Sequence, residues 1–209
     1  MTSRWERIAP LTGVLAVAII VLTFTVVSGS TPDTKDSAEK IFAFYQKHRD
    51  RQMGAAFILS IGAALLIFFS GTLRGALALA PARGRLASVA FGGGIASAAG
   101  FFVAGTVHLA LADSGKRGTP AVAQTLAYLD DNTYLAFGAG IGVMALAGGI
   151  SIVRTRVVPL WLGIVGIVGG VATFTPLGFF GFLLSALWIV MMSVALAVRP
   201  PQVAGTTVD

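Results

Sequence analysis

Residues 86–112 read LASVAFGGGIASAAGFFVAGTVHLALA, a stretch without one charged side chain. A helix crosses the roughly 30 Å hydrocarbon core of a bilayer with about 20 apolar residues, so this stretch is long enough to span a membrane. Other runs of the same kind lie on both sides of it. The six predicted spans cover about residues 8–27, 54–79, 86–112, 134–153, 157–174 and 179–198.

These spans predict the fold class, an all-α polytopic transmembrane helical bundle. The chain forms one predicted membrane domain over residues 1–209, of which residues 199–209 are expected to be a flexible cytoplasmic tail. The composition agrees, because 56% of the residues are hydrophobic and only 11% are charged, with a mean hydropathy of +0.84. A soluble domain needs about a quarter of its residues charged to cover its surface.

The net charge of +6 would suggest nucleic-acid binding in a soluble protein. Here the basic residues lie in short loops beside apolar runs, where they anchor the loops at anionic headgroups. We therefore expect membrane lipids as partners and no nucleic acid. The lack of cysteine in the sequence excludes disulfides, thiolate metal sites, iron–sulfur clusters and cysteine nucleophiles.

The arginines predict the orientation through the positive-inside rule. If the N-terminus is cytoplasmic, the short inner segments hold Arg4, Arg7, Arg83, Arg85, Arg154, Arg156 and Arg199. The outer loops hold nearly as many basic residues over longer stretches, so charge density favours this orientation. We expect a multi-pass protein of the bacterial plasma membrane with both termini cytoplasmic. The first span is longer than the 7–15 apolar residues typical of a signal peptide, so we expect it to be retained.

Two long outer loops are predicted to carry short amphipathic helices. In the first loop, Asp36 and Glu39 resemble a capping box, and apolar residues follow at helical spacing. The loop before the fourth span has a helix-forming run at 121–128. These helices either rest at the membrane interface or cover a cavity. We expect Asp130 or Asp131 to cap the N-terminus of the fourth span.

Residues 54–112 and 134–174 each form a predicted hairpin that turns at an inner Arg-x-Arg sequence. This pattern hints at two pseudo-repeated hairpins, as in some transporters. The spacings within the two hairpins differ, so chance and the positive-inside rule explain the pattern equally well.

Small residues predict how the helices pack, because helices in lipid associate through close backbone approach rather than through a hydrophobic force. The third span carries a series of residues at four-residue spacing, nearly all small, that we expect to be buried. The series is Gly92, Ala96, Gly100, Ala104, His108 and Ala112. Trp188 falls near the middle of the last span and is expected to fill a gap between helices.

His108 is the one imidazole within a predicted span and the sharpest candidate for a site. Its functional interpretation is a proton-responsive or ligand-contacting group in an outer vestibule. The alternative is a neutral histidine that hydrogen-bonds across helices, to Thr106 or to a hydroxyl on another span. The candidate vestibule residues are His108, Asp113, Asp50, Asp130, Asp131 and Tyr134.

A second candidate site is an apolar pocket in the outer half of the bundle, formed by phenylalanines that could equally face acyl chains. They are Phe101, Phe102, Phe179, Phe180 and Phe182. We expect no metal and no cofactor, because the spans hold no Lys, Asp or Glu at mid-depth and a bis-histidine haem needs a second buried imidazole. The sequence has no nucleophile–base–acid set, phosphate loop or H-E-x-x-H motif, so we predict that the protein is not an enzyme.

Four short motifs carry a resemblance to a known family. They are residues 41–45 (IFAFY), 69–77 (FSGTLRGAL), 86–94 (LASVAFGGG) and 158–163 (VPLWLG). Over nearly its whole length, the chain resembles a family of six-span integral membrane proteins that is common in actinobacteria and has no assigned activity. The commoner pattern of that family has an arginine where this chain has Leu160. The resemblance implies a six-span fold and lends no activity.

From these observations we expect a non-enzymatic membrane protein that binds a lipid or an apolar small molecule, or that acts as an accessory subunit of a membrane complex. Glycine-rich helix faces serve packing within a chain and between chains, so a membrane-protein partner or a homo-oligomer is also compatible with them. The alternatives are a small-solute transporter built from the two hairpins and an envelope sensor that uses His108.

Overall fold

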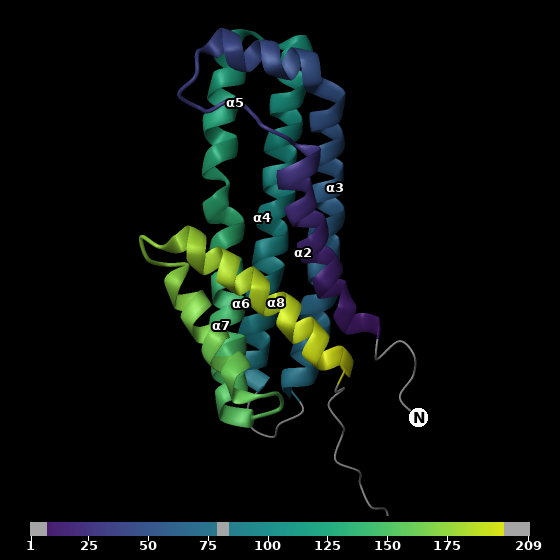
Figure 1. The fold of residues 1–209 in the computed structure, drawn as a ribbon, viewed down its shortest axis with the longest axis vertical. Helices are drawn as coiled ribbons and strands as arrows, with labels where there is room; N and C mark the ends of the chain where they lie inside the picture. Colours follow the sequence, from purple (N-terminus) through teal and green to yellow (C-terminus); the bar gives the residue numbers. More distant parts are fainter. Residues whose placement is uncertain (1–7, 79–83, 199–209) are drawn as a thin grey trace, which may run out of the picture.

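The computed structural model describes residues 8–78 and 84–198, and this part of the chain is helical and contains no strand (Figure 1). The predicted all-α bundle of the membrane-spanning type is confirmed. The elements, in chain order, are η1 (Ala9–Leu11), α2 (Thr12–Leu22), η2 (Thr23–Val27), α3 (Ala38–Ala78), α4 (Gly84–Arg117), α5 (Pro120–Asn132), α6 (Tyr134–Thr155), α7 (Leu160–Ala172) and α8 (Gly178–Val198). The predicted tail and the arginines Arg4, Arg7, Arg83 and Arg199 lie outside the described residues.

Within residues 8–78 and 84–198, five helical stretches are long and apolar enough to cross a membrane. They are the first helix from η1 to η2, α3, α4, the stacked pair α5 and α6, and α8. The fifth predicted span, 157–174, is shorter than expected, since the helix found there, α7, has 13 residues. At a rise of 1.5 Å per residue it is about 20 Å long. Pro159, in an extended conformation, delays its start to Leu160.

The predicted antiparallel hairpin of the last two spans is present as α7 and α8, which pack against the lower half of the bundle in Figure 1. Trp188 of α8 is fully buried, and its indole N–H donates a hydrogen bond of 2.9 Å to the carbonyl of Leu162 in α7. The prediction that this residue fills a gap between helices is confirmed.

The predicted outer amphipathic helix is the first part of α3, which continues into the second span through a kink at His48 (φ −112°, ψ 15°). In Figure 1 the segment before the kink lies across the top of the bundle. Its apolar residues Ile41 and Tyr45 are buried against Leu111 of α4 and Ala127 of α5. The apolar face of this helix therefore packs on the protein itself.

The capping box predicted at Asp36 is wrong by one residue. The helix α3 begins at Ala38, and the hydroxyl of Ser37 accepts a hydrogen bond of 3.3 Å from the backbone N–H of Lys40. The carboxylate of Asp36 has other partners. It accepts a hydrogen bond of 2.8 Å from the Lys40 ammonium and one of 3.0 Å from the Asp33 backbone N–H. The hydrogen bond from Lys40 holds the pKa of Asp36 below its usual range.

The second predicted amphipathic helix is α5, which begins after Thr119, whose hydroxyl accepts from the backbone N–H of Val122. Neither Asp130 nor Asp131 caps the fourth span, so that prediction is wrong. The helix α5 includes both aspartates and meets α6 end to end through Thr133, which keeps helical backbone angles. At this junction the Thr133 amide donates to the Asp130 carbonyl at 3.1 Å and the Ala136 amide donates to the Thr133 carbonyl at 2.9 Å, so the chain passes from α5 into α6 without a side-chain cap.

The helices α4 and α6 are in backbone contact through glycines. A Cβ atom on Gly93 would lie 2.6 Å from the Met144 nitrogen, and one on Gly140 would lie 2.3 Å from the Ser97 nitrogen. The predicted stripe is therefore only partly right, since Gly92 and Ala96 are exposed. Four residues rotate a helix by about 400°, so each step of the series drifts by about 40° and six members cannot share one face.

The two hairpins proposed as a repeat have unequal helices. The first pairs α3 and α4, of 41 and 34 residues, and the second pairs α6 and α7, of 22 and 13 residues. These lengths give no support to a pseudo-repeat.

Charge separates along the bundle axis. The acidic residues that the structure describes lie in the upper half of the bundle in Figure 1, on the chain leading into α3, the first part of α3, the end of α4 and the end of α5. We call this the acidic end. The opposite end, where α3 meets α4 and α6 turns into α7, has Arg74, Arg85, Arg154 and Arg156 as its described charges, and we call it the arginine end.

The α4–α6 contact predicts that alanine substitutions at two adjacent glycines differ in their effect on stability. We expect Gly93→Ala to lower the free energy of unfolding by about 1–3 kcal/mol, because its Cβ meets the α6 backbone, which has no rotamer to change. Gly92→Ala is the matched control, since a Cβ there meets nothing within 4 Å. Thermal unfolding of both variants in the same detergent measures the difference. Equal stability of the two would contradict a close contact between the α4 and α6 backbones.

Candidate functional site

His108 of α4 bridges two other helices at the acidic end. Its Nδ1 lies 2.8 Å from Oδ2 of Asp130 in α5, and its Nε2 lies 2.9 Å from Oε1 of Gln52 in α3. The histidine does hydrogen-bond across helices, but its partners are neither Thr106 nor a hydroxyl. The Thr106 hydroxyl donates instead to the Phe102 carbonyl of its own helix.

We call the contacts of His108 with Asp130 and Gln52 the bridge. Gln52 fixes which of its own side-chain atoms faces the His108 ring. This amide is fully buried, and its Nε2 donates a hydrogen bond of 2.7 Å to the carbonyl of Ser28. Flipping the amide would set its oxygen against that carbonyl, so Oε1 must face His108. Both ring nitrogens of His108 then face acceptors. The doubly protonated imidazolium, with an N–H on each nitrogen, is the form that satisfies both.

Tyr45 closes the bridge from the side of the acidic end. Its ring packs edge-on against the His108 ring, with 6.2 Å between centroids, and the residue is 3% exposed. Burial, with a smaller contribution from the Asp130 carboxylate, raises the pKa of Tyr45 far above its usual range. The phenol therefore stays neutral beside the imidazole of His108 and the carboxyl group of Asp130.

A cavity of about 250 Å³ lies beside the bridge, between the first helix, α3, α4 and the junction of α5 and α6. Its apolar wall is formed by Ala55, Ala56, Leu59, Ala104 and Phe137. Its polar wall has His108, Asp130, Asp131 and the chain at Ser28, Gly29 and Thr31. Phe24 also lines the cavity and is 49% exposed, so the cavity reaches the outer surface of the bundle. The apolar wall thus suits the hydrocarbon part of a ligand, and the polar wall suits a polar headgroup.

The structure brings four of the six predicted vestibule residues to this cavity, namely His108, Asp130, Asp131 and Tyr134. Asp113 and Asp50 are not among them. Both pair with Arg49, at 2.5 Å from Asp113 and 3.2 Å from Asp50, on the flank of α3. Asp50 is almost fully exposed and faces solvent.

Tyr134 contributes its ring rather than its hydroxyl. The ring packs edge-on against Phe137 and Phe182, with centroids 5.8 and 5.9 Å away. The hydroxyl is buried beside Gly178 and has no hydrogen-bond partner within the described ranges. The residue therefore forms part of the apolar floor.

The phenylalanines predicted to form an apolar pocket do not lie together. Phe101 is fully buried and stacks on Phe137 at 4.3 Å between centroids, and Phe182 also contacts the Phe137 ring, at 5.5 Å between centroids. The remaining three, Phe102, Phe179 and Phe180, are between 38% and 67% exposed. The reason is helical phase, since adjacent residues point about 100° apart.

Sequence reasoning missed Gln52, Phe137 and Arg51. Gln52 follows Tyr45 by seven residues, but the kink at His48 lies between them, so no local spacing indicated its contact with His108. The Arg51 guanidinium binds the carbonyls of Val26 and Val27, at 2.5 and 2.6 Å. It therefore holds the end of the first helix against α3, a contact between segments that no local pattern indicates.

The chain was compared with protein-family models, with curated proteins and with solved structures, and no match was found. The resemblance to an actinobacterial family stays a prediction. Within 8–78 and 84–198 no three His, Asp or Glu side chains form a group that could hold a metal ion. For contact with a ligand, the cavity offers hydrogen-bonding and charged side chains beside an apolar wall.

The buried amide predicts a stability difference between two glutamines of α3. Gln52→Met should lower the free energy of unfolding by about 2–6 kcal/mol, because it leaves the Ser28 carbonyl and a His108 N–H without partners at about 1–3 kcal/mol each. Gln46→Met is the control, since Gln46 is exposed. Thermal unfolding compares the two. A Gln52→Met protein as stable as the control would show that the bridge is dispensable.

Proposed function

We propose that this chain is a multi-pass protein of the plasma membrane that binds one small amphipathic molecule, such as a lipid, in the cavity at the acidic end, without catalysing a reaction. The observation that carries the proposal is the two-sided lining of that cavity. Its apolar wall of Ala56, Leu59 and Phe137 faces a polar wall that contains His108 and Asp131. Ligand sites in proteins typically combine an apolar lining with a few placed polar groups.

The size of the cavity limits what it holds. At about 250 Å³ it is smaller than most sites for drug-sized molecules. It fits a small molecule or the head and first carbons of a lipid, and the rest of such a lipid would leave past Phe24 toward the membrane. Because Phe24 is half exposed at the edge of the cavity, this path leads to the outside of the bundle.

The charged side chains of the cavity favour a ligand whose polar headgroup carries N–H donors. His108 and Asp130 satisfy each other across 2.8 Å. Asp131 is exposed and has no hydrogen bond or ion pair within the described residues. Its carboxylate is an acceptor, so an ammonium or amide head would be bound better than a phosphate.

The surrounding structure supports binding rather than transport. The first part of α3 covers the cavity end of the bundle and is held by the buried Ile41 and Tyr45. The transporter alternative relied on two similar hairpins, and the unequal helix lengths do not favour it. With the positive-inside rule, the arginine end is cytoplasmic and the cavity lies in the outer half.

Filling the cavity tests the proposal. We expect native mass spectrometry of the protein, released gently from its own membrane, to show one bound small molecule or lipid. Ala104→Phe should abolish this adduct, because Ala104 lines the cavity and is 4% exposed. Ala99→Phe is the matched control on the exposed side of the same helix.

Two results would overturn the proposal. One is an adduct that Ala104→Phe retains at the level of the control. The other is a wild-type protein that binds nothing when its own membrane lipid extract is added back. A stoichiometric partner protein in the same spectrum would instead favour the accessory-subunit interpretation.

A second candidate function, an envelope sensor, is favoured by the position of His108 between α3 and α5. A neutral imidazole has a single N–H, so deprotonation leaves either Gln52 or Asp130 without its donor. We expect hydrogen exchange of residues 38–52 to become faster at high pH than at low pH, beyond the intrinsic pH dependence of exchange. His108→Ala should remove this difference while the protein remains folded. A variant that simply unfolds would make the imidazole structural and remove the support for a sensor.

A further inference from the structure

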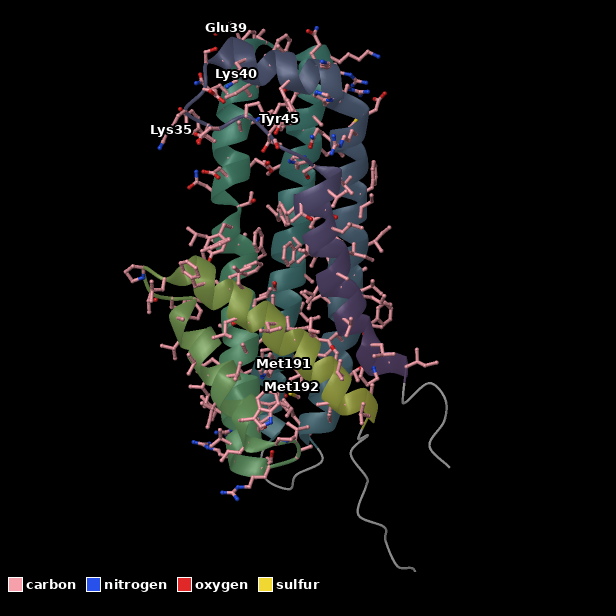
Figure 2. The ribbon with its side chains drawn as sticks, viewed as in Figure 1. Lys35, Glu39, Lys40, Tyr45, Met191 and Met192 are labelled. Carbon is pink, nitrogen blue, oxygen red and sulfur yellow. The ribbon has the colours of Figure 1, made fainter. Side chains whose placement is uncertain are left out.

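A second hollow, of about 860 Å³, lies at the arginine end between the α6–α7 turn and the last turns of α8. One wall is formed by residues of the turn and by Trp161, and the other by Met191, Val194 and Val198. Figure 2 labels Met191 on the part of α8 that crosses the bundle above this turn. Trp161, Val194 and Val198 are about half exposed or more. The groove is therefore apolar and open to the surroundings of the bundle.

Arg156 lies at one edge of this groove in an unusual backbone conformation. It ends α6 with φ 54° and ψ 29°, and it is the one non-glycine residue with a positive φ among the described residues. Helices usually place glycine at such a position, because a Cβ atom crowds the backbone there. An arginine is a poor residue for making this turn. Its side chain, however, puts a permanent positive charge beside an apolar groove.

That charge has no counter-ion from the described part of the protein. The acidic residues with described positions lie at the opposite end of the bundle. Arg156 is exposed, and Trp161, five residues later, is exposed as well. Tryptophan with arginine at a helix end is the pattern of a membrane interface, where lipid headgroups begin. The groove thus presents hydrocarbon-binding residues next to a cation at headgroup level.

The oblique course of α8 explains why the groove exists (Figure 1). The helix α8 also contacts the first helix, whereas α7 packs against α6, so the end of α8 and the start of α7 diverge at the arginine end. The end of α8 therefore keeps exposed valines, Val194 and Val198, that no helix within the described ranges covers. In a membrane, lipid chains fill such a gap beside apolar side chains.

From this geometry we infer a binding site for one anionic phospholipid of the leaflet at the arginine end. Its phosphate pairs with Arg156, and one acyl chain lies in the groove between Trp161 and Val194. Basic pockets between membrane helices bind anionic headgroups in this way. The site lies at the other end of the bundle from the cavity beside His108, so it stands independently of the proposed function.

Native mass spectrometry of the full chain in detergent, with dioleoyl phosphatidylglycerol and dioleoyl phosphatidylcholine as the added lipids, tests the site. We expect the wild type to retain one phosphatidylglycerol more tightly than phosphatidylcholine. Arg156→Gly and Arg156→Asn should lower phosphatidylglycerol binding roughly fivefold and leave phosphatidylcholine binding unchanged. Both substitutions suit a positive φ, so thermal unfolding should show no loss of stability. Arg156→Lys should keep the preference.

Two further variants separate this site from a general effect of charge. Arg85→Gln removes an exposed arginine from the same end and should leave the preference intact. Val194→Trp fills the groove and should lower phosphatidylglycerol binding with Arg156 in place. The inference is overturned if Arg85→Gln loses as much as Arg156→Gly, if Arg156→Gly keeps the preference, or if Val194→Trp changes nothing.

Discussion

The backbone contact between α4 and α6 is the constraint on which the rest of the structure depends. In lipid no hydrophobic force drives helices together, so the close approach at Gly93 and Gly140 has to supply the packing. Because α5 continues α6 beyond the junction at Thr133, the same contact sets the position of Asp130. The bridge to His108 and the cavity beside it depend on how α4 and α6 are aligned.

Hydropathy was sufficient to predict the class of fold and most of the spans. It could not predict that α4 continues to Arg117, because polar residues form helices in water as readily as they form loops. Nor could it predict which face of α4 is buried. Glycine neighbours such as Gly92 and Gly93 look alike in sequence, and only the position of α6 makes one exposed and the other buried.

The candidate site was also only partly predictable, because local sequence signals identify candidate residues but not their partners. His108 stood out as the one imidazole in an apolar run, and Asp130 as an acid just beyond a span. Asp113 carried the same signal, yet it pairs with Arg49, 64 residues earlier in the chain. The choice between equivalent acids depends on contacts between distant segments. Local spacing holds no information about such contacts, which is also why Gln52 was missed.

The π-helical turn η2 has a consequence for how the cavity of this protein could change in evolution. A π-turn holds one residue more than the α-helical turn it replaces, and such turns are frequent at functional sites. In η2 the turn is formed at Thr23–Val27, where Thr23 and Phe24 line the cavity. Deleting a single residue there would restore an α-helical turn and change which residues of this turn face the cavity, while α2 before it stays in place. The cavity wall could thus be reshaped by one codon gained or lost, without any change in α3, α4 or α6, which form its other walls.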